Sequence, residues 1–322
     1  MFRKFKRKIL ISVIFAAVIF LAISLYADFG KLLSAFSRFN WLWLPLLLGL
    51  AFMNYVSRFI KWEIYLKSLG IKLTKKMSIT IFFASFIMSI TPGKMGELLK
   101  SYLVREVNGE PLSKTMPIVF AERVTDFLSM TFLAIVGAYV FNYGQGIIIA
   151  IGIIFVLLVV ILSNKKICFS LLNLLKKIKF LSKYAEKFIT AYESINTLLK
   201  FKTLVSTFII SGFAWFFECL AFYFVLKIFA QSGSAEVSVL TATFIYCFST
   251  LVGAVAMLPG GLGATEASLT GLLIFLNISK DISAASTIII RICTLWFAVI
   301  LGIIATWLYE RFTKIKSLEV IQ

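Results

Sequence analysis

Long, uninterrupted apolar stretches follow one another along the chain and are separated by short polar segments. Six of them are about long enough to cross a bilayer, since a transmembrane helix needs roughly 20 predominantly apolar residues. These six stretches are residues 9–26, 41–60, 117–141, 147–162, 204–230 and 283–308. Transmembrane strands would instead alternate apolar and polar positions over about 10 residues. The pattern therefore predicts an all-α fold and a polytopic helical membrane protein.

Two further apolar stretches are interrupted midway by the same motif, PGxxG, with a glutamate shortly after it. The motif residues in the two copies are Pro92, Gly93, Gly96 and Glu97, and Pro259, Gly260, Gly263 and Glu266. An arginine within an apolar helix follows each copy: Arg123 lies 31 residues after Pro92, and Arg291 lies 32 residues after Pro259. One PGxxG would be a weak signal, because Pro and Gly mark turns in many proteins. Its recurrence with a matched arginine indicates an internal repeat.

The composition excludes an ordinary water-soluble domain, because 60% of the 322 residues are hydrophobic and only 15% are charged. The 33 Lys and Arg exceed the 15 Asp and Glu, but the excess lies between the apolar stretches, so it does not indicate nucleic-acid binding. It gathers near the N-terminus, after residue 60, in residues 165–202 and near the C-terminus. By the positive-inside rule these segments face the cytoplasm. We therefore predict a multi-pass protein of the cell membrane with cytoplasmic N- and C-termini.

With these segments inside, the interrupted stretches become re-entrant helical hairpins of opposite orientation. Residues 77–91 and 96–104 form a hairpin that opens to the cytoplasm, and residues 237–257 and 263–276 form one that opens outward. Helices broken near the midplane of inverted repeats are typical of a transporter's substrate site. The alternative is that Pro and Gly only bend packed helices.

The predicted architecture is thus a single transmembrane domain over residues 1–322, with six full spans plus two re-entrant helical hairpins in an inverted repeat. The first repeat covers residues 41–142, and the second, inverted repeat covers residues 204–308. Between them, residues 164–202 mix leucine, isoleucine and phenylalanine with many lysines. That mixture is typical of amphipathic helices on an anionic leaflet. A plain interfacial connector would have the same composition.

Arg123 and Arg291 stand inside apolar helices, where each costs on the order of 2.5–3.5 kcal/mol on insertion scales. Because a buried arginine needs an acidic partner, we expect Glu97 to pair with Arg123 and Glu266 to pair with Arg291. One interpretation is that these ion pairs only fix helix packing. The other is that both arginines converge with the N-terminal ends of the broken half-helices on a phosphate, which a guanidinium binds through its planar fork.

Other charged residues near the first motif also have two interpretations. Glu122 and Asp126 lie one helical turn apart and, if they are buried, could bind protons and so couple transport to proton movement. The sequence contains no GxxxxGK[ST] motif, so the use of ATP by this chain has no support. Lys100 flanks the inner hairpin, where it would guide a head group or simply snorkel. Arg58 and Trp62 end the second apolar stretch as an interfacial anchor would, and this interpretation is preferred to a role in substrate binding.

The sequence gives little support for a metal site, a disulfide framework or a catalytic residue. The chain has no histidine, which removes the commonest general base and metal ligand. Its four cysteines lie far apart without CxxC spacing, so neither a zinc site nor a disulfide framework is indicated. We therefore predict no metal, no cofactor and no catalytic residue.

Four segments together carry a resemblance to a known family: PGKMGELLKSYL, AERVTDFL, LPGGLGATEASLTGLL and the late helix around Arg291. From about residue 41 to residue 308 the sequence resembles the flippase-like family named after the transmembrane region of lysylphosphatidylglycerol synthase, the multiple peptide resistance factor. The resemblance implies a lipid-translocating fold associated with aminoacylated phosphatidylglycerol or polyprenyl-phosphate-linked sugars. By position it implies that the substrate is bound by Pro92, Gly93, Gly96, Glu97, Arg123, Asp126, Pro259, Gly260, Gly263, Glu266 and Arg291. The charge pattern adds Lys100 to this set.

Full-length synthases of that family carry a soluble acyltransferase domain after the membrane part, whereas this sequence stops at Gln322. Lysyl transfer is therefore not expected, and we predict no enzyme activity. We expect a flippase-like transporter that moves an anionic phospholipid or a polyprenyl-phosphate-linked sugar between leaflets. Its expected partners are these lipids and a separate glycosyl- or aminoacyl-transferase, and not nucleic acid. The alternatives are a membrane subunit that presents lipid to a separate transferase, and a small-molecule transporter.

Overall fold

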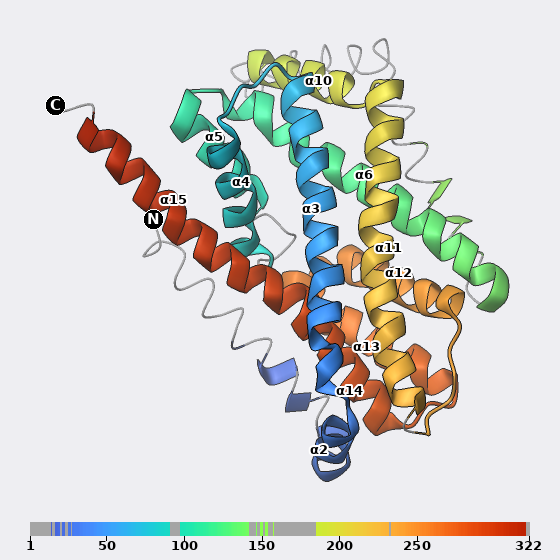
Figure 1. The fold of residues 1–322 in the computed structure, drawn as a ribbon. Helices are drawn as coiled ribbons and strands as arrows, with labels where there is room; N and C mark the ends of the chain where they lie inside the picture. Colours follow the sequence, from blue (N-terminus) through green and yellow to red (C-terminus); the bar gives the residue numbers. More distant parts are fainter. Residues whose placement is uncertain are drawn as a thin grey trace.

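The computed structural model of the chain describes residues 28–90, 97–141, 185–231 and 233–319, with a few isolated residues in 14–26 and 146–157. Within these residues all regular secondary structure is helical, and none of it is strand (Figure 1). The all-α prediction is confirmed for this part of the chain. The predicted spans 9–26 and 147–162 lie outside it except for the isolated residues, and residues 164–184 of the predicted basic connector lie outside it altogether.

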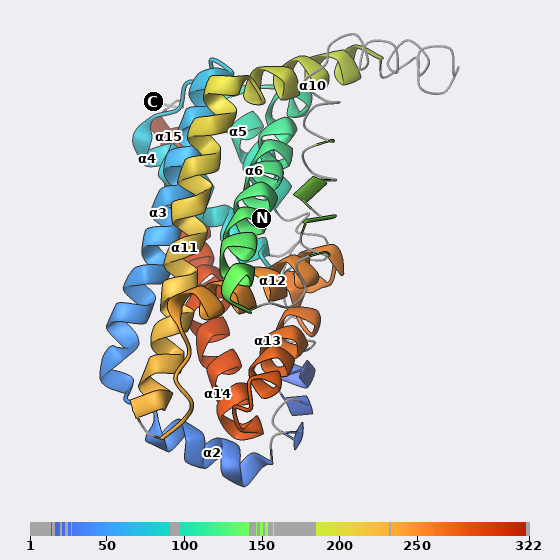
Figure 2. The same ribbon diagram turned by 90° about the vertical axis from the view of Figure 1, so that its right-hand side faces the viewer.

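Two long helices, α3 (Leu44–Ser68) and α11 (Phe201–Gln231), lie side by side along the length of the molecule (Figures 1 and 2). α3 follows a 3-10 turn over Trp41–Trp43 and has a proline in its first turn, where the missing N–H has no intrahelical partner to lose. Asn54 of α3 is fully buried, and its side-chain amide donates to the carbonyl oxygen of Ala214 in α11 at 2.8 Å. This bond ties the two helices together, because a buried amide without a partner is costly.

Among the residues that the structure describes, three helical segments are long and apolar enough to cross a membrane: Trp41–Ser68, Phe201–Gln231 and Lys280–Thr313. They confirm the predicted apolar helices of residues 41–60, 204–230 and 283–308, and each is longer in the structure than predicted. The third consists of α14 (Lys280–Arg291), a π-helical turn over Ile292–Trp296 and the start of α15 (Phe297–Glu319). The predicted span 117–141 falls within α6 (Leu112–Phe141), which packs against α11 and α12.

The helices around the first motif lie in the half of the molecule that contains α10 (Ala185–Leu198) (Figures 1 and 2). They are α4 (Lys75–Ala84), which continues as a 3-10 turn over Ser85–Met88, and α5 (Leu98–Asn108). Pro92, Gly93 and Gly96 lie outside the described residues.

The second motif joins α12 (Val239–Val255) to α13 (Ala264–Phe275) through a 3-10 turn over Pro259–Gly261. α12 lies across the middle of the molecule, and α13 lies in the half that contains α2 (Phe29–Arg38) (Figures 1 and 2). The helices α4 and α5 beside the first motif and α13 after the second therefore reach toward opposite ends of the bundle.

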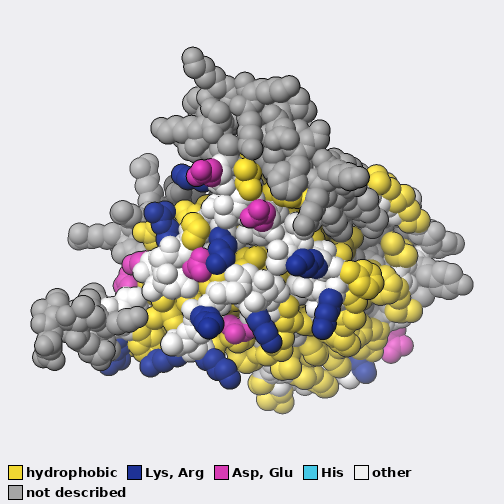
Figure 3. Space-filling model, turned by 90° about the horizontal axis from the view of Figure 1, so that it is seen from above, with side chains coloured by type: hydrophobic (Ala, Val, Ile, Leu, Met, Phe, Trp, Pro, Cys, Tyr) yellow, Lys and Arg dark blue, Asp and Glu magenta, His cyan; other side chains and the backbone are white. Residues whose placement is uncertain are grey.

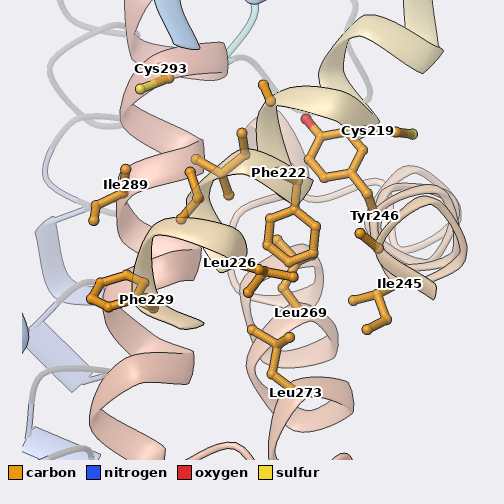
Figure 4. Close-up of a cluster of buried hydrophobic side chains, with 14 of the residues drawn as sticks. Cys219, Phe222, Leu226, Phe229, Ile245, Tyr246, Leu269, Leu273, Ile289 and Cys293 are labelled. Carbon is orange, nitrogen blue, oxygen red and sulfur yellow. The ribbon is translucent and has the colours of Figure 1, made fainter. Parts of the chain in front are cut away.

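Apolar side chains of four helices pack together in the half that contains α13 (Figure 4). Phe222 and Leu226 of α11 lie between Tyr246 of α12 and Leu269 and Leu273 of α13, and all five are at least nine-tenths buried. This cluster holds α12 and α13, which flank the second motif, against the long helix α11. It therefore fixes the position of the motif relative to the bundle.

The face of the molecule at the α10 end carries many Lys and Arg side chains (Figure 3). Exposed lysines of this end stand in the connection from α3 to α4 and at the start of α11, namely Lys67, Lys72, Lys75, Lys76, Lys200 and Lys202. The positive-inside rule would place this end in the cytoplasm. The orientation of the chain in the membrane stays a prediction.

Helix backbones approach closely at two glycines. A Cβ on Gly302 of α15 would overlap the backbone of Phe86 and Ile87 in the 3-10 turn after α4. A Cβ on Gly137 of α6 would lie 2.6 Å from the carbonyl oxygen of Leu240 in α12. Small residues at such contacts are typical of membrane helices, because close van der Waals packing holds helices together where the surrounding lipid is itself apolar.

Replacing Gly302 with alanine should destabilise the protein, because the added methyl group meets backbone atoms that cannot rotate away. Overpacking of this kind costs roughly 1–3 kcal/mol, so the melting temperature in detergent should fall by a few degrees. Gly49→Ala in α3 is the matched control, since a Cβ there would meet nothing within 4 Å. If both variants melt like the wild type, α15 and the turn after α4 are not packed as described.

Candidate functional site

A cavity of about 80 Å³ lies between the two interrupted segments. Ser89 and Glu97 border it from the two sides of the first motif, and Gly260 and Thr265 border it from the second. The segments also touch, because a Cβ on Gly260 would lie 3.5 Å from the Cα of Ile90. Other lining side chains come from α3, α11, α12 and the segment from the end of α14 to the start of α15. Two motifs far apart in the sequence thus border one cavity.

The second motif folds around its arginine. Arg291, which is 8% exposed, donates from Nε to Oε1 of Glu266 at 2.6 Å and from Nη2 to the carbonyl oxygen of Gly260 at 2.7 Å. The other carboxylate oxygen of Glu266 accepts from the backbone N–H of Gly263 at 2.6 Å, which caps the start of α13. Gly260 and Gly263 have φ of 61° and 89°, a region that glycine enters without steric cost. The predicted pairing of Arg291 with Glu266 is confirmed.

The first motif contributes a carboxylate that lies between two guanidinium groups. Arg123 of α6 donates from Nε to Oε2 of Glu97 at 3.1 Å, which confirms the second predicted pair. Arg58 of α3 approaches the other oxygen of Glu97 with Nη2 at 3.5 Å, the outer limit of a hydrogen bond. The side chain of Arg58 is 15% exposed and borders the cavity. The interpretation of Arg58 as an interfacial anchor is therefore wrong, because α3 continues to Ser68 and places this arginine inside the bundle.

Two further ion pairs are buried, and their residues do not border the cavity. Lys61 of α3 contacts Asp126 of α6 at 2.5 Å and the hydroxyl oxygen of Ser211 in α11 at 2.6 Å. Lys100 of α5 pairs with Glu122 of α6, and each of these side chains is 2% exposed. Lys100 and Asp126 thus lie away from the cavity surface. The predicted role of these two residues and of the motif residues in substrate binding stays a prediction.

The end of α3 corrects two more interpretations. Lys61 was expected in a cytoplasmic loop and Trp62 at the interface, yet both are fully buried. The indole N–H of Trp62 donates to the hydroxyl oxygen of Ser78 in α4 at 3.1 Å. The reason is that α3 continues for eight residues beyond Ile60, the predicted end of the span, so these side chains face α4, α6 and α11 instead of water.

The side chains that border the cavity and that sequence reasoning missed include Tyr55, Trp215, Glu218 and Tyr246. Glu218 is 7% exposed in α11, and its Oε2 accepts from the hydroxyl of Tyr246 in α12 at 2.6 Å. The hydroxyl of Tyr55 donates to the carbonyl oxygen of Thr294 in the π-helical turn at 2.5 Å. A glutamate in the middle of an apolar helix was a usable signal, because acidic residues in membrane spans are rare and mark functional positions.

This arrangement is suited to binding a phosphate-bearing group. Guanidinium groups from α3 and α14, namely those of Arg58 and Arg291, border one cavity from different helices, and a guanidinium matches the geometry of phosphate oxygens. The aromatic rings and hydroxyl groups of the wall can contact the rest of such a ligand.

Comparison with known proteins places the chain among membrane proteins. Its residues 9–302 match the family model described as the lysylphosphatidylglycerol synthase TM region. A UPF0104 membrane protein of Methanocaldococcus jannaschii is 29% identical over 231 residues, which make up 70% of this chain and 95% of the relative. A UPF0104 membrane protein of Methanothermobacter thermautotrophicus is 24% identical over 338 residues, covering 96% of this chain and 95% of the relative. One from Pyrococcus horikoshii is 25% identical over 272 residues, or 76% and 80% of the two chains.

Breaking the pair between Lys61 and Asp126 should destabilise the protein strongly. Lys61→Ala or Asp126→Ala leaves one charge buried without its partner, which typically costs about 3–5 kcal/mol. Replacing both with apolar residues of similar size, as Lys61→Met with Asp126→Leu, should recover most of the loss, because no uncompensated charge remains. Unfolding in detergent at increasing denaturant measures these stabilities, and the single variants Lys61→Met and Asp126→Leu complete the double-mutant cycle.

The matched control for this cycle is the partly exposed pair of Lys114 and Glu110, which lie four residues apart in the sequence and contact each other at 2.9 Å. Lys114→Ala should change stability by no more than about 0.5 kcal/mol, since solvent screens exposed ion pairs. Similar losses for Lys61→Ala and Lys114→Ala would contradict the buried position of Lys61.

Proposed function

We propose that this chain, which belongs to the lysylphosphatidylglycerol synthase transmembrane-region family, carries the head group of an anionic lipid between the two leaflets. One observation carries the proposal: a single cavity is bordered by both interrupted segments and by the guanidinium groups of Arg58 and Arg291. In this proposal the phosphate rests on the arginines while the acyl or prenyl tails stay in the bilayer. The family name makes aminoacylated phosphatidylglycerol one candidate, and a polyprenyl-phosphate-linked sugar is the other.

Arg58 is the guanidinium best suited to hold the phosphate. Its contact with Glu97 is long, at 3.5 Å, and Glu97 has Arg123 as a second basic partner. A phosphate could therefore attract Arg58 without leaving Glu97 unpaired. Arg291 is held by short bonds to Glu266 and Gly260, so it contributes positive charge from a fixed position.

The arrangement of the helices supports movement across the membrane. The helices α4 and α5 beside the first motif and α13 after the second reach toward opposite ends of the bundle, and the segments that carry the motifs meet at the cavity. In the proposed topology these are re-entrant hairpins of an inverted repeat with six full spans, and the basic α10 end faces the cytoplasm. Alternate opening of the two ends would then expose the same cavity to each leaflet in turn. A separate glycosyl- or aminoacyl-transferase would supply or use the lipid.

Replacing Arg58 with alanine should slow translocation of a phosphatidylglycerol analogue labelled in its head group, measured in liposomes that contain the purified protein. A hydrogen bond to a charged group contributes about 1.5–3 kcal/mol, so we expect a loss of roughly 10- to 150-fold. Arg58→Lys should retain part of the rate, because lysine keeps the charge but loses the planar fork. The melting temperature reports whether each variant is folded.

Arg311→Ala is the control, since Arg311 is exposed near the end of α15 and lies outside the cavity. Wild-type rates in a folded Arg58→Ala protein would contradict the proposed site. Transport of soluble anions with no movement of lipid would favour the small-molecule transporter. Lipid binding without translocation would favour a subunit that presents lipid to a transferase.

A further inference from the structure

The buried apolar side chains of the described residues form two separate clusters. The α13 core is built mainly from α2, α11, α12, α13 and α14, and it contains Tyr246 and Cys293 (Figure 4). The α4 core is built mainly from α3, α4, α5 and α15, and it contains Tyr55 and Ala298. Tyr246, Tyr55 and Ala298 all border the cavity. The cavity therefore lies at the boundary between two separately packed cores.

The segment from α14 to α15 passes from one core to the other at this boundary. α14 packs against α2, α11 and α13, whereas α15 packs against α4 and the 3-10 turn after it. The π-helical turn Ile292–Trp296 joins them, so that Cys293 belongs to the α13 core and Ala298 to the α4 core. Thr294 and Leu295 of this turn border the cavity. α3 and α6 also cross the boundary, but neither has a π-helical turn there.

The backbone of this turn is less regular than that of the helices beside it. The N–H of Phe297 donates to the carbonyl oxygen of Ile292, five residues back instead of the usual four. The hydroxyl of Thr294 donates to the carbonyl oxygen of Ile290 at 2.8 Å, and bonds of this type often bend helices. Sharp bends occur at π-helical turns, which are frequent at functional sites. Bending of the segment is therefore easiest at this turn.

A tyrosine of the α4 core holds the turn in place. The hydroxyl of Tyr55 in α3 donates to the carbonyl oxygen of Thr294 at 2.5 Å. The ring of Tyr55 packs edge-on against Phe86 in the 3-10 turn after α4, with 5.1 Å between ring centroids. Leu295 contacts the second motif, since a Cβ on Gly260 would lie 3.4 Å from its Cδ2. The turn is thus connected both to the α4 core and to the second motif.

The cavity has to enlarge before it can hold a lipid head group. Its volume is about 80 Å³, whereas sites for small molecules usually have about 300–1,000 Å³. Closely packed cores deform little, so the extra space has to come from a movement of the two cores relative to each other.

We propose that the π-helical turn Ile292–Trp296 is a hinge between the α13 core and the α4 core, and that the hydrogen bond from Tyr55 holds this hinge closed. Bending at the turn separates the cores and enlarges the cavity between them. The inference rests on the proposed function for the purpose of this motion. The motion itself can be measured without any transport of lipid.

Distances between pairs of spin labels test the hinge in the purified full chain in phosphatidylcholine nanodiscs. The exposed positions Lys67 and Arg311 lie next to the α4 core, and Lys227 and Lys280 lie next to the α13 core. A ketone-bearing amino acid carries each label, so that the cysteines of the chain stay unlabelled. The pairs Lys67–Lys280 and Lys227–Arg311 join the two cores and should show a second, minor distance that differs by a few ångströms. The control pairs Lys67–Arg311 and Lys227–Lys280 should each give one narrow distance.

Two variants should shift the hinge in opposite directions. Tyr55→Phe removes the hydroxyl that holds the turn, so the share of the second distance should rise about two- to tenfold, the effect of one net hydrogen bond. Deletion of Ile292, the exposed first residue of the turn, should restore a regular α-helix and leave a single distance, because a π-helical turn contains about one residue more than an α-helical turn.

Tyr65→Phe is the matched control for Tyr55→Phe. Tyr65 also lies in α3, but its hydroxyl donates to the carbonyl oxygen of Ala121 in α6, away from the turn. This variant should leave all four distances unchanged. The melting temperature shows whether each variant is folded.

Other outcomes overturn a defined part of the proposal. If the pairs that join the cores give one narrow distance in the wild type and in a folded Tyr55→Phe protein, the turn is not a hinge. If Tyr65→Phe changes the distances as much as Tyr55→Phe does, the bond to Thr294 is not what holds the turn.

Translocation of labelled phosphatidylglycerol in liposomes separates the hinge from the proposed function. A folded protein without Ile292 should be at least tenfold slower than the wild type. Full translocation by this variant with a single fixed distance would refute the role of the hinge in transport. Two distances in a wild-type protein that moves no lipid would contradict the proposed function and leave the hinge in place.

Discussion

Charges buried in an apolar helix bundle need partners, and this constraint determines how the helices of this protein meet. Besides the long contact of Arg58 with Glu97, four basic side chains of the described part of the bundle each contact a carboxylate from another helix or helix junction: Lys61 with Asp126, Lys100 with Glu122, Arg123 with Glu97, and Arg291 with Glu266. Three of these contacts converge on α6 from α3, from α5 and from the residue before α5. The fourth joins α13 to the end of α14. A charge left unpaired in such surroundings would cost several kcal/mol, so the helices are held where the pairs can form.

The same pairs place the cavity. Glu97 follows the first motif directly and is held by Arg123, while Glu266 both caps α13 and binds Arg291. Each break in the chain is therefore anchored by its own glutamate to a nearby helix. Because the anchored segments approach one another at Gly260 and Ile90, the irregular backbone of the second motif meets protein and a polar cavity. Only such surroundings tolerate non-helical backbone inside a membrane.

The sequence predicted the parts of this structure that follow from length and from charge balance. The length of the apolar runs alone identified the helices at residues 41–60, 204–230 and 283–308, although each predicted helix was shorter than the observed one. Charge balance identified the partners of Arg123 and Arg291, because each motif supplied one glutamate and each following helix one arginine. The re-entrant hairpins, the membrane orientation and the roles of the motif residues stay predictions.

The predictions for Arg58 and Lys61 were wrong because a basic residue at the end of an apolar run can lie either at the membrane interface or inside the helix bundle. Lys61 and Arg58 stand near the end of an apolar run, and a lysine or arginine there usually reaches the interface. No local pattern shows that α3 continues to Ser68, which buries Lys61 against α6 and α11 and places Arg58 beside the cavity. Glu218 was overlooked because it lies among aromatic residues without a motif. Its neighbours across the cavity come from α3, α12 and α14, and such contacts are visible only once the chain is folded.

The contacts around the cavity differ in how much a ligand would have to disrupt. Arg291 makes two short bonds with Glu266 and Gly260, so displacing it would also release the cap of α13 and the turn of the second motif. Arg58 makes one long contact with a carboxylate that Arg123 also binds. Binding an anion at Arg58 therefore breaks little of the structure that forms the cavity. A site that must fill and empty repeatedly benefits from this difference, because a rigid guanidinium keeps the positive potential in place while a loosely held one follows the ligand.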